Sequence, residues 1–263
     1  MSAEQDISLD EKRVYAGGSA RTAFVATDAG LVEASVSDDL LGEYGLVHRA
    51  ATRDVVAADG RVAAAAEDAL LATDDGFTPT GFGTADAVGF ADGLVAAGEG
   101  RVARYDDGAW THLGDVSGVR AVAGDLLAAG GGVFRLDGSH AGLDAARDVA
   151  VGTEVFAATD DGLYALANGW MKRRSGAFRA VSTRAGSALA VAADGTVFEH
   201  HDGEWVDTEA PGDVVDAVPT ADALYAVTGD GTFLARATGG DDASAGWRER
   251  ALGLPGCRRL AVV

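Results

Sequence analysis

The sequence contains almost no lysine, one cysteine and few aromatic residues. Only Lys12 and Lys172 occur among 263 residues, against 19 arginines, and aromatic residues make up 7%. The lone Cys257 excludes an internal disulfide bond and a cysteine-rich metal site. No run of about 18 apolar residues occurs, and the first residues lack the basic segment and apolar core of a secretory signal. We therefore expect a soluble, cytoplasmic protein.

Negative charge dominates what is present. The formal net charge is -20, and 30 of the 41 acidic residues are aspartates. Short, strongly hydrated carboxylates suit a surface that stays soluble in molar salt, where repulsion is screened within about 3 Å. The composition favours a halophilic cytoplasm over the alternative, an acidic mesophilic protein from a GC-rich genome. It argues against nucleic acid and anionic membranes as partners.

A charged residue followed by a short apolar run recurs seven times along the chain. Most neighbouring copies lie about 30 to 40 residues apart, the length of one four-stranded propeller blade. We interpret each apolar run as the inner strand of a blade. The charged residues are Asp54, Asp86, Arg120, Asp148, Arg179, Asp216 and Arg259.

Two further sequence features also recur seven times along the chain. One is a hairpin whose turn carries glycine, because glycine accepts the positive φ of such turns. Its positions are Gly30, Gly100, Gly132, Gly162, Gly195 and Gly231, with Ala69 in the weaker copy Val62–Thr73. The other is a bulky residue that opens the outer strand and is expected to fill the gap between blades: Leu46, Phe77, Trp110, Leu143, Trp170, Trp205 and Trp247.

Together the three recurring features predict an all-β protein, a seven-bladed β-propeller of four-stranded antiparallel blades. Six blades is the alternative if Val62–Thr73 forms no hairpin. The chain ends on an inner-strand pattern, so we expect this C-terminal strand to complete the first blade and close the ring. The segment Arg13–Ala16 competes for the same place. We assign residues 1–11 to a loose lead-in and residues 12–263 to a single propeller domain.

The acidic blades, rich in alanine, valine, aspartate and glycine, give the chain a recognisable character. Together with KRVY at residues 12–15 and RRLAVV at residues 258–263, they resemble an uncharacterised haloarchaeal β-propeller family. The resemblance implies a fold and an archaeal lineage, and it supplies no functional residue. The repeated Gly-His and Trp-Asp signature and the kelch glycine doublet are absent from the sequence.

The seven charged residues are the candidate ligand-binding set. Inner strands line the channel of a propeller, so we expect all seven side chains near one mouth. Their nearly alternating signs predict salt bridges between neighbouring blades. The alternative is a polar pocket with arginine available for a carboxylate or phosphate. Asp54 and Asp86 break the alternation and should repel unless Arg120 or Arg259 serves both, or a cation or water lies between them, so we expect a ligand to enter on this side.

No metal, cofactor or catalytic set is predicted. Residues His200 to Glu204 (HHDGE) are the densest potential metal ligands, but adjacent residues of a strand point to opposite sides. The turn carboxylates Asp28, Asp160, Asp161, Asp194 and Asp230 are interpreted as turn residues rather than calcium ligands.

The favoured hypothesis is a non-enzymatic, monomeric scaffold that presents loops to a protein partner. The alternative is a small-molecule hydrolase or lyase with a site at the channel mouth. Extra residues on one face would favour an enzyme, and the longest insertion is only Gly239–Ala245. The sequence does not establish whether the protein is an enzyme, and it favours a protein without enzymatic activity.

The net charge of -20 predicts that stability depends on salt. Lowering the salt from molar to about 0.1 M should lower the melting temperature, because repulsion among carboxylates is then less screened. Circular dichroism melts over a series of KCl concentrations would measure this. A melting temperature that stays flat or rises on dilution would contradict it.

Overall fold

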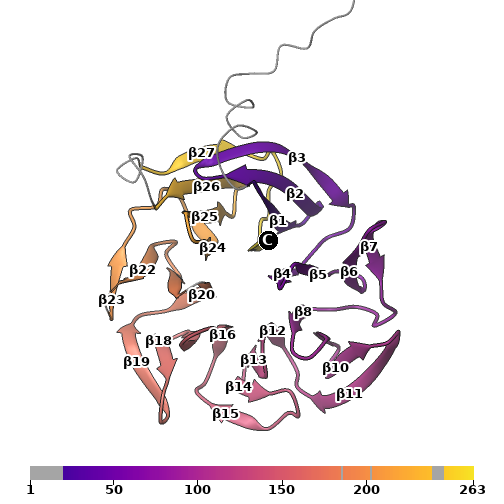
Figure 1. Cartoon of the computed structure of the whole chain (residues 1–263). Helices are drawn as coiled ribbons and strands as arrows, with labels where there is room; N and C mark the ends of the chain where they lie inside the picture. The colour runs from indigo at the N-terminus through magenta and orange to yellow at the C-terminus, as the bar shows by residue number, and fades with distance from the viewer. Residues whose placement is uncertain (1–19, 185, 202, 239–245) are drawn as a thin grey trace, which may run out of the picture.

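The chain folds into a closed ring of β-sheets around a central axis (Figure 1). The computed structural model describes residues 20–184, 186–201, 203–238 and 246–263. Within these residues, no helix is long and apolar enough to cross a membrane. The lead-in, the segment Arg13–Ala16 and the insertion Gly239–Ala245 lie outside the described residues.

Seven four-stranded antiparallel sheets form the blades, and the strands of each blade run in order from the inner to the outer one. Blade 1 contains β28 (Arg259–Val262), β1 (Arg21–Thr27), β2 (Gly30–Ser37) and β3 (Leu40–His48). Blade 2 contains β4 (Asp54–Ala58), β5 (Arg61–Ala65), β6 (Ala69–Thr73) and β7 (Gly76–Pro79). Blade 3 contains β8 (Ala87–Phe90), β9 (Leu94–Gly98), β10 (Arg101–Asp106) and β11 (Ala109–Asp115).

The remaining blades repeat this order. Blade 4 contains β12 (Val119–Ala123), β13 (Leu126–Ala129), β14 (Gly132–Arg135) and β15 (His140–Gly142). Blade 5 contains β16 (Ala146–Val151), β17 (Val155–Thr159), β18 (Gly162–Leu166) and β19 (Trp170–Ser175). Blade 6 contains β20 (Phe178–Arg184), β21 (Ser187–Ala192), β22 (Val197–His201) and β23 (Glu204–Asp207). Blade 7 contains β24 (Val214–Pro219), β25 (Ala223–Thr228), β26 (Thr232–Ala237) and β27 (Arg248–Ala251).

The prediction of seven blades is confirmed, and so is closure by the C-terminal strand. The weaker copy Val62–Thr73 does form a hairpin, from β5 and β6, so the alternative of six blades is excluded. Strand β28 pairs antiparallel with β1, with Ala23 opposite Val262 and Ala26 opposite Arg259. The last strand of the chain therefore shares a sheet with the first described strand and supplies the inner strand of blade 1, which closes the ring.

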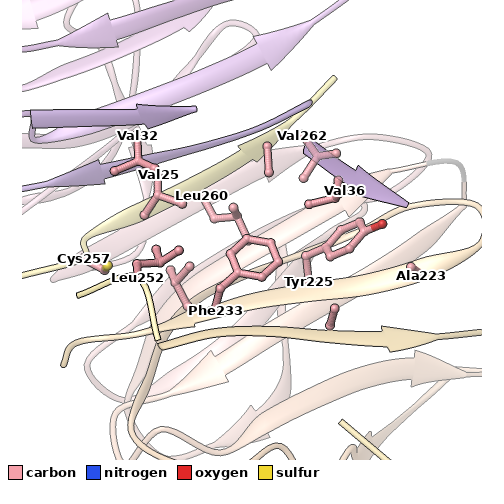
Figure 2. Packing of buried hydrophobic residues seen from close by; sticks show 13 residues of the cluster. Val25, Val32, Val36, Ala223, Tyr225, Phe233, Leu252, Cys257, Leu260 and Val262 are labelled. Atoms are coloured by element: carbon pink, nitrogen blue, oxygen red, sulfur yellow. The ribbon is translucent and has the colours of Figure 1, made fainter. Parts of the chain in front are cut away.

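The hydrophobic core is divided among the seven interfaces between blades. Each interface holds one cluster of buried residues, mostly alanine, valine and leucine. Figure 2 shows the cluster between blades 7 and 1, where Tyr225 and Phe233 pack against Leu260 and Val262. Because side chains alternate along a strand, Ala261 points the other way and packs against blade 2. Every inner strand is thus buried on both faces.

Bulky residues on the outer strands join neighbouring blades at the rim, as the sequence predicted. The indole nitrogens of Trp110, Trp170 and Trp247 each donate a hydrogen bond to a carbonyl of the preceding blade or its connection, at 2.8 to 3.1 Å. Trp205 packs edge-on against Phe156 of the preceding blade instead. The wide outer gap is therefore closed by large rings, while small side chains fill the narrow part near the axis.

Hairpin glycines are required at positions where the backbone is crowded. Gly30 has φ +144°, and a Cβ atom there would lie 2.0 Å from the carbonyl oxygen of His48. Gly60 also has a positive φ, +74°, but a Cβ atom there would meet nothing within 4 Å. The two glycines therefore separate the effect of backbone strain from that of a steric clash.

This pair yields a stability prediction. Gly60→Ala should lower the free energy of unfolding by about 1 kcal/mol, because only the strained φ matters. Gly30→Ala should lower it by about 3 kcal/mol or more, because the outer strand must also move away. Urea denaturation of both variants would measure the difference. Equal losses would show that the β2–β3 contact at Gly30 is not tight.

Candidate functional site

The seven charged residues predicted to form one ring lie at two levels. Pairing with the second strand of each blade defines one equivalent position on every inner strand: Asp54 lies opposite Ala65, Asp148 opposite Ala158, and Arg259 opposite Ala26. Around the ring this first inner position holds Arg259, Asp54, Ala87, Ala121, Asp148, Ala180 and Asp216. Asp86, Arg120 and Arg179 come one residue earlier in the chain.

β-Bulges explain the displaced level of Arg120 and Arg179, whereas Asp86 directly precedes β8, whose pairing with β9 has no register shift. Four inner strands change register just before the first inner position, which leaves one unpaired extra residue in each. The extra residues are Arg120, Arg147, Arg179 and Val215. A bulge interrupts the alternation of side chains and turns the extra one aside. The side chain of the extra residue therefore reaches the channel mouth, whereas the residue after it, at the first inner position, is buried at the axis.

We call Asp54, Asp148, Asp216 and Arg259 the axial set. Its three aspartates are 5 to 6% exposed. Each accepts two backbone hydrogen bonds, one from the next residue of its own strand and one from the inner strand of the next blade. The donors are Val55 and Val88 for Asp54, Val149 and Val181 for Asp148, and Ala217 and Leu260 for Asp216, at 2.8 to 3.0 Å. Each carboxylate thus fastens two blades together.

Arg259 crosses the channel from blade 1 to blade 5. Its two terminal nitrogens donate to both carboxylate oxygens of Asp148, at 2.7 and 3.1 Å. Its Nε lies 3.7 Å from Asp54 of the neighbouring blade. We expected pairing between neighbouring blades, and the shortest pairing instead spans the axis. The expected arginine shared by Asp54 and Asp86 is not found among the described residues: Arg259 lies near Asp54, whereas Asp86 lies 3.9 Å from Arg53.

The axial set has three carboxylates for one guanidinium. Burial raises the pKa of Asp216 to about 7, against the attraction of Arg259. Burial also raises the pKa of Asp54 above its ordinary range. For Arg259, burial lowers the pKa, but the nearby carboxylates of Asp148, Asp216 and Asp54 raise it further, so the side chain stays a cation. Asp216 therefore exchanges its proton close to neutral pH.

An axial cavity begins at the axial set and follows the inner strands away from it. Its volume is about 420 Å³. The four charged residues form its floor, and its walls are mainly valine and alanine from the inner strands. At the other end it reaches the turns after the inner strands, near Asp59, Val151, Arg184 and Val263. Arg259 separates this cavity from the opposite mouth.

The opposite mouth carries a collar of charged residues, one step before the first inner position. Its members are Arg53, Asp86, Arg120, Arg147, Arg179 and Arg258. Four of its arginines pair with nearby carboxylates, in the pairs Arg53–Asp86, Arg147–Asp160, Arg179–Asp213 and Arg258–Asp28. Hydrogen bonding to Arg147 lowers the pKa of the Asp160 carboxyl. Arg120 is exposed and donates to the carbonyl of Ala146, at 3.0 Å.

Sequence reasoning missed three members of the collar. Arg53, Arg147 and Arg258 directly precede members of the axial set, in the doublets Arg-Asp, Arg-Asp and Arg-Arg. These doublets were the available signal, because adjacent residues near a strand end reach different levels. His200 and His201 also diverge: His200 stacks on Trp205 and His201 is exposed. Among the described residues, no three His, Cys, Asp or Glu side chains could hold a metal ion.

The raised pKa of Asp216 predicts a pH-dependent effect of its replacement. The folded state favours neutral Asp216, so this stabilisation is present below the ordinary aspartate pKa and is lost as the pH rises through about 7. Asp216→Asn removes the titrating group. It also lowers the free energy of unfolding by an amount that does not depend on pH, because one hydrogen bond becomes poorer. Relative to wild type, the variant should gain up to roughly 4 kcal/mol between about pH 4 and about pH 8.

Urea denaturation across this pH range would measure the gain. Asp86→Asn is the matched control, because Asp86 is exposed at the collar. A difference between wild type and Asp216→Asn that is constant with pH would show that Asp216 does not titrate there.

Comparison with known proteins places the ring among propellers. A chain in the crystal structure of a nidogen/laminin complex superposes with a TM-score of 0.64 at 9% identity, covering 92% of this chain and 98% of that one. The WD40 domain of Pan2 from Neurospora crassa gives 0.57 at 14%, covering 86% and 90%. YCF48 bound to D1 peptide gives 0.53 at 13%, covering 77% and 81%. At these identities the likeness concerns the fold alone.

Sequence comparison is more specific. No curated protein matches the chain. The sequence model of a β-propeller family described as HVO_0234-like matches residues 8–263, which is nearly the whole chain. This match confirms the resemblance to a haloarchaeal propeller family noted from the blades and the C-terminal motif. The chain belongs to the HVO_0234-like β-propeller family.

Proposed function

We propose that this propeller is a non-enzymatic scaffold that binds a protein partner at the mouth ringed by the collar. The observation that carries the proposal is the collar itself. Five arginines from five different blades surround one mouth of a ring whose net charge is -20. Arginine is enriched at protein interfaces, where its planar group donates several hydrogen bonds at once.

Arg120 is the point at which we expect the partner to add a contact. It is the one collar arginine that has no carboxylate within salt-bridge distance among the described residues. The turn between β13 and β14 in its blade holds glycines, Gly130 and Gly131, where blades 1 and 5 supply Asp28 and Asp160. A carboxylate of the partner, from an acidic side chain or a chain end, would complete the pattern.

Two structures with the same fold support a protein partner. One is the nidogen/laminin complex and the other is YCF48 bound to D1 peptide. In a propeller the strands form a rigid ring, and the turns at each mouth are free to vary without disturbing it. The collar arginines lie at the ends of such strands, so their positions are fixed before binding, which reduces the entropy lost on association.

We further infer that the scaffold operates in a salty cytoplasm. Two lysines against 19 arginines and 30 aspartates form a surface of short, hydrated carboxylates. Long-range attraction is screened at high salt, so a partner must form close, directional contacts. Bidentate arginine–carboxylate pairs meet that need better than lysine pairs.

A small-molecule hydrolase or lyase is the second candidate, and one observation favours it. Asp216 lies on the floor of the axial cavity with a pKa of about 7, which suits proton transfer at neutral pH. The scaffold is preferred because all three axial carboxylates already accept two backbone hydrogen bonds, and Arg259 is held by Asp148. These contacts give the charged groups a structural task.

The collar proposal is tested by charge reversal. Arg120→Glu should weaken binding of the partner at least about tenfold, because it places a carboxylate against a carboxylate. Affinity purification of tagged wild type from its native host in high salt would supply the partner, and calorimetry would measure its dissociation constant.

Arg173→Glu is the matched control, because Arg173 is exposed on the outer strand β19, away from the mouth. Equal affinities of wild type and both variants would refute the collar as the docking face. So would an equal loss of affinity in both variants, since that reports only on total charge.

A further inference from the structure

The axial cavity has the size and composition of a small-ligand site. Its volume of about 420 Å³ lies within the range of small-molecule pockets, roughly 300 to 1,000 Å³. Residues of all seven inner strands line it, and most of them are valine or alanine. The charged groups gather at one end, on the floor formed by the axial set. An occupant would therefore have one charged end and an apolar body.

The floor carries more negative than positive charge. Arg259 is the one cation facing three carboxylates, and its shortest contacts go to Asp148. It also approaches Asp54, at 3.7 Å. Among the described residues, no cation lies within salt-bridge distance of Asp216, although that side chain is 5% exposed. Asp216 shares the attraction of Arg259 with Asp148 and Asp54, so a second cation brought to Asp216 would be stabilised there.

The contacts of the three aspartates discriminate between kinds of cation. A metal ion needs several oxygens that converge on one point, and no such group occurs among the described residues. Each axial carboxylate also has both oxygens engaged with backbone amides. An ammonium group needs only one or two such oxygens, and each oxygen of Asp216 accepts one hydrogen bond and so retains a free lone pair. Its hydrocarbon chain would lie against walls that include Val56, Ala123 and Val218.

We propose that the axial cavity binds the ammonium group of an alkylamine, with the cation beside Asp216 and the hydrocarbon chain against the valine and alanine walls. The amine is either a free small molecule or the side chain of a lysine in a partner. The amine enters through the cavity mouth that is lined by one acidic and one basic residue, Asp59 and Arg184. This site lies on the far side of Arg259 from the collar, so it is separate from the proposed docking face.

Binding of n-butylammonium, measured by calorimetry and thermal shift, tests the proposal. The ammonium should bind saturably and raise the melting temperature, whereas n-butanol, which has the same shape without the charge, should not. Asp216→Asn should weaken the binding at least about tenfold, because the counter-charge is lost. Asp74→Asn removes the same charge from an exposed turn and should leave the affinity unchanged.

A second variant keeps the test decisive if Asp216→Asn fails to fold. Val151 lies at the cavity mouth and is 42% exposed, so Val151→Trp should obstruct entry while leaving the floor intact. It should abolish binding of n-butylammonium.

A blocked Gly-Lys-Gly peptide distinguishes the two sources of the amine. Tighter binding of the peptide than of n-butylammonium would identify a lysine of a partner as the source. Tighter binding of n-butylammonium would identify a free small amine.

Three results would overturn the proposal. The first is no binding of either n-butylammonium or the peptide at the lowest salt at which the protein stays folded. The second is equal binding of n-butylammonium and n-butanol, because the charge would then contribute nothing. The third is unchanged binding of n-butylammonium in both Asp216→Asn and Val151→Trp, because the amine would then occupy another place.

Discussion

The contact of Arg259 with Asp148 across the axis is the interaction on which the centre of this ring depends. Three aspartates are buried there because each fastens its own blade to the next one through backbone amides. Buried carboxylates repel one another and lose hydration, so without a cation the centre would favour neutral, protonated side chains. Arg259 supplies that cation, and its bidentate geometry with Asp148 recovers part of the free energy lost on dehydration.

The chain end gives this arginine its special position. Arg259 belongs to β28, the strand that closes the ring, so the cation reaches the axis only when the last strand pairs with β1. Ala87, Ala121 and Ala180 occupy the equivalent places on three other blades, and their small side chains leave room for the guanidinium to cross. Closure of the ring and neutralisation of its centre are therefore the same structural event. This coupling favours the complete ring over forms that lack β28.

The sequence predicted the blades well because blade structure repeats. Turn glycines such as Gly30 and rim residues such as Trp170 recur at blade spacing. The structural role of each can be inferred from the sequence of a single blade. The axial set was harder to predict. Blades 4 and 5 carry the same bulge, at Arg120 and Arg147, but the charged residue that directly precedes the apolar run is the bulge residue Arg120 in blade 4 and the next residue, Asp148, in blade 5, so Arg120 and Asp148 looked equivalent although they lie at different levels. No local pattern could reveal that Arg259 spans the axis, because its partner is 111 residues away.

The same arginine sets the relation between the two ends of the axis. The collar and the axial cavity lie on opposite sides of Arg259, whose guanidinium donates to the backbone carbonyl of the collar residue Arg120, at 3.4 Å, and attracts the Asp216 carboxylate on the cavity floor. Arg259 is held by Asp148 and approaches Asp54, so a partner at the collar and an amine in the cavity can both bind without moving it. Two ligands that leave a shared element in one state have no coupling free energy through it. Binding at one site should therefore not be coupled to binding at the other through a movement of Arg259, and the centre that separates them serves as a fixed partition rather than a switch.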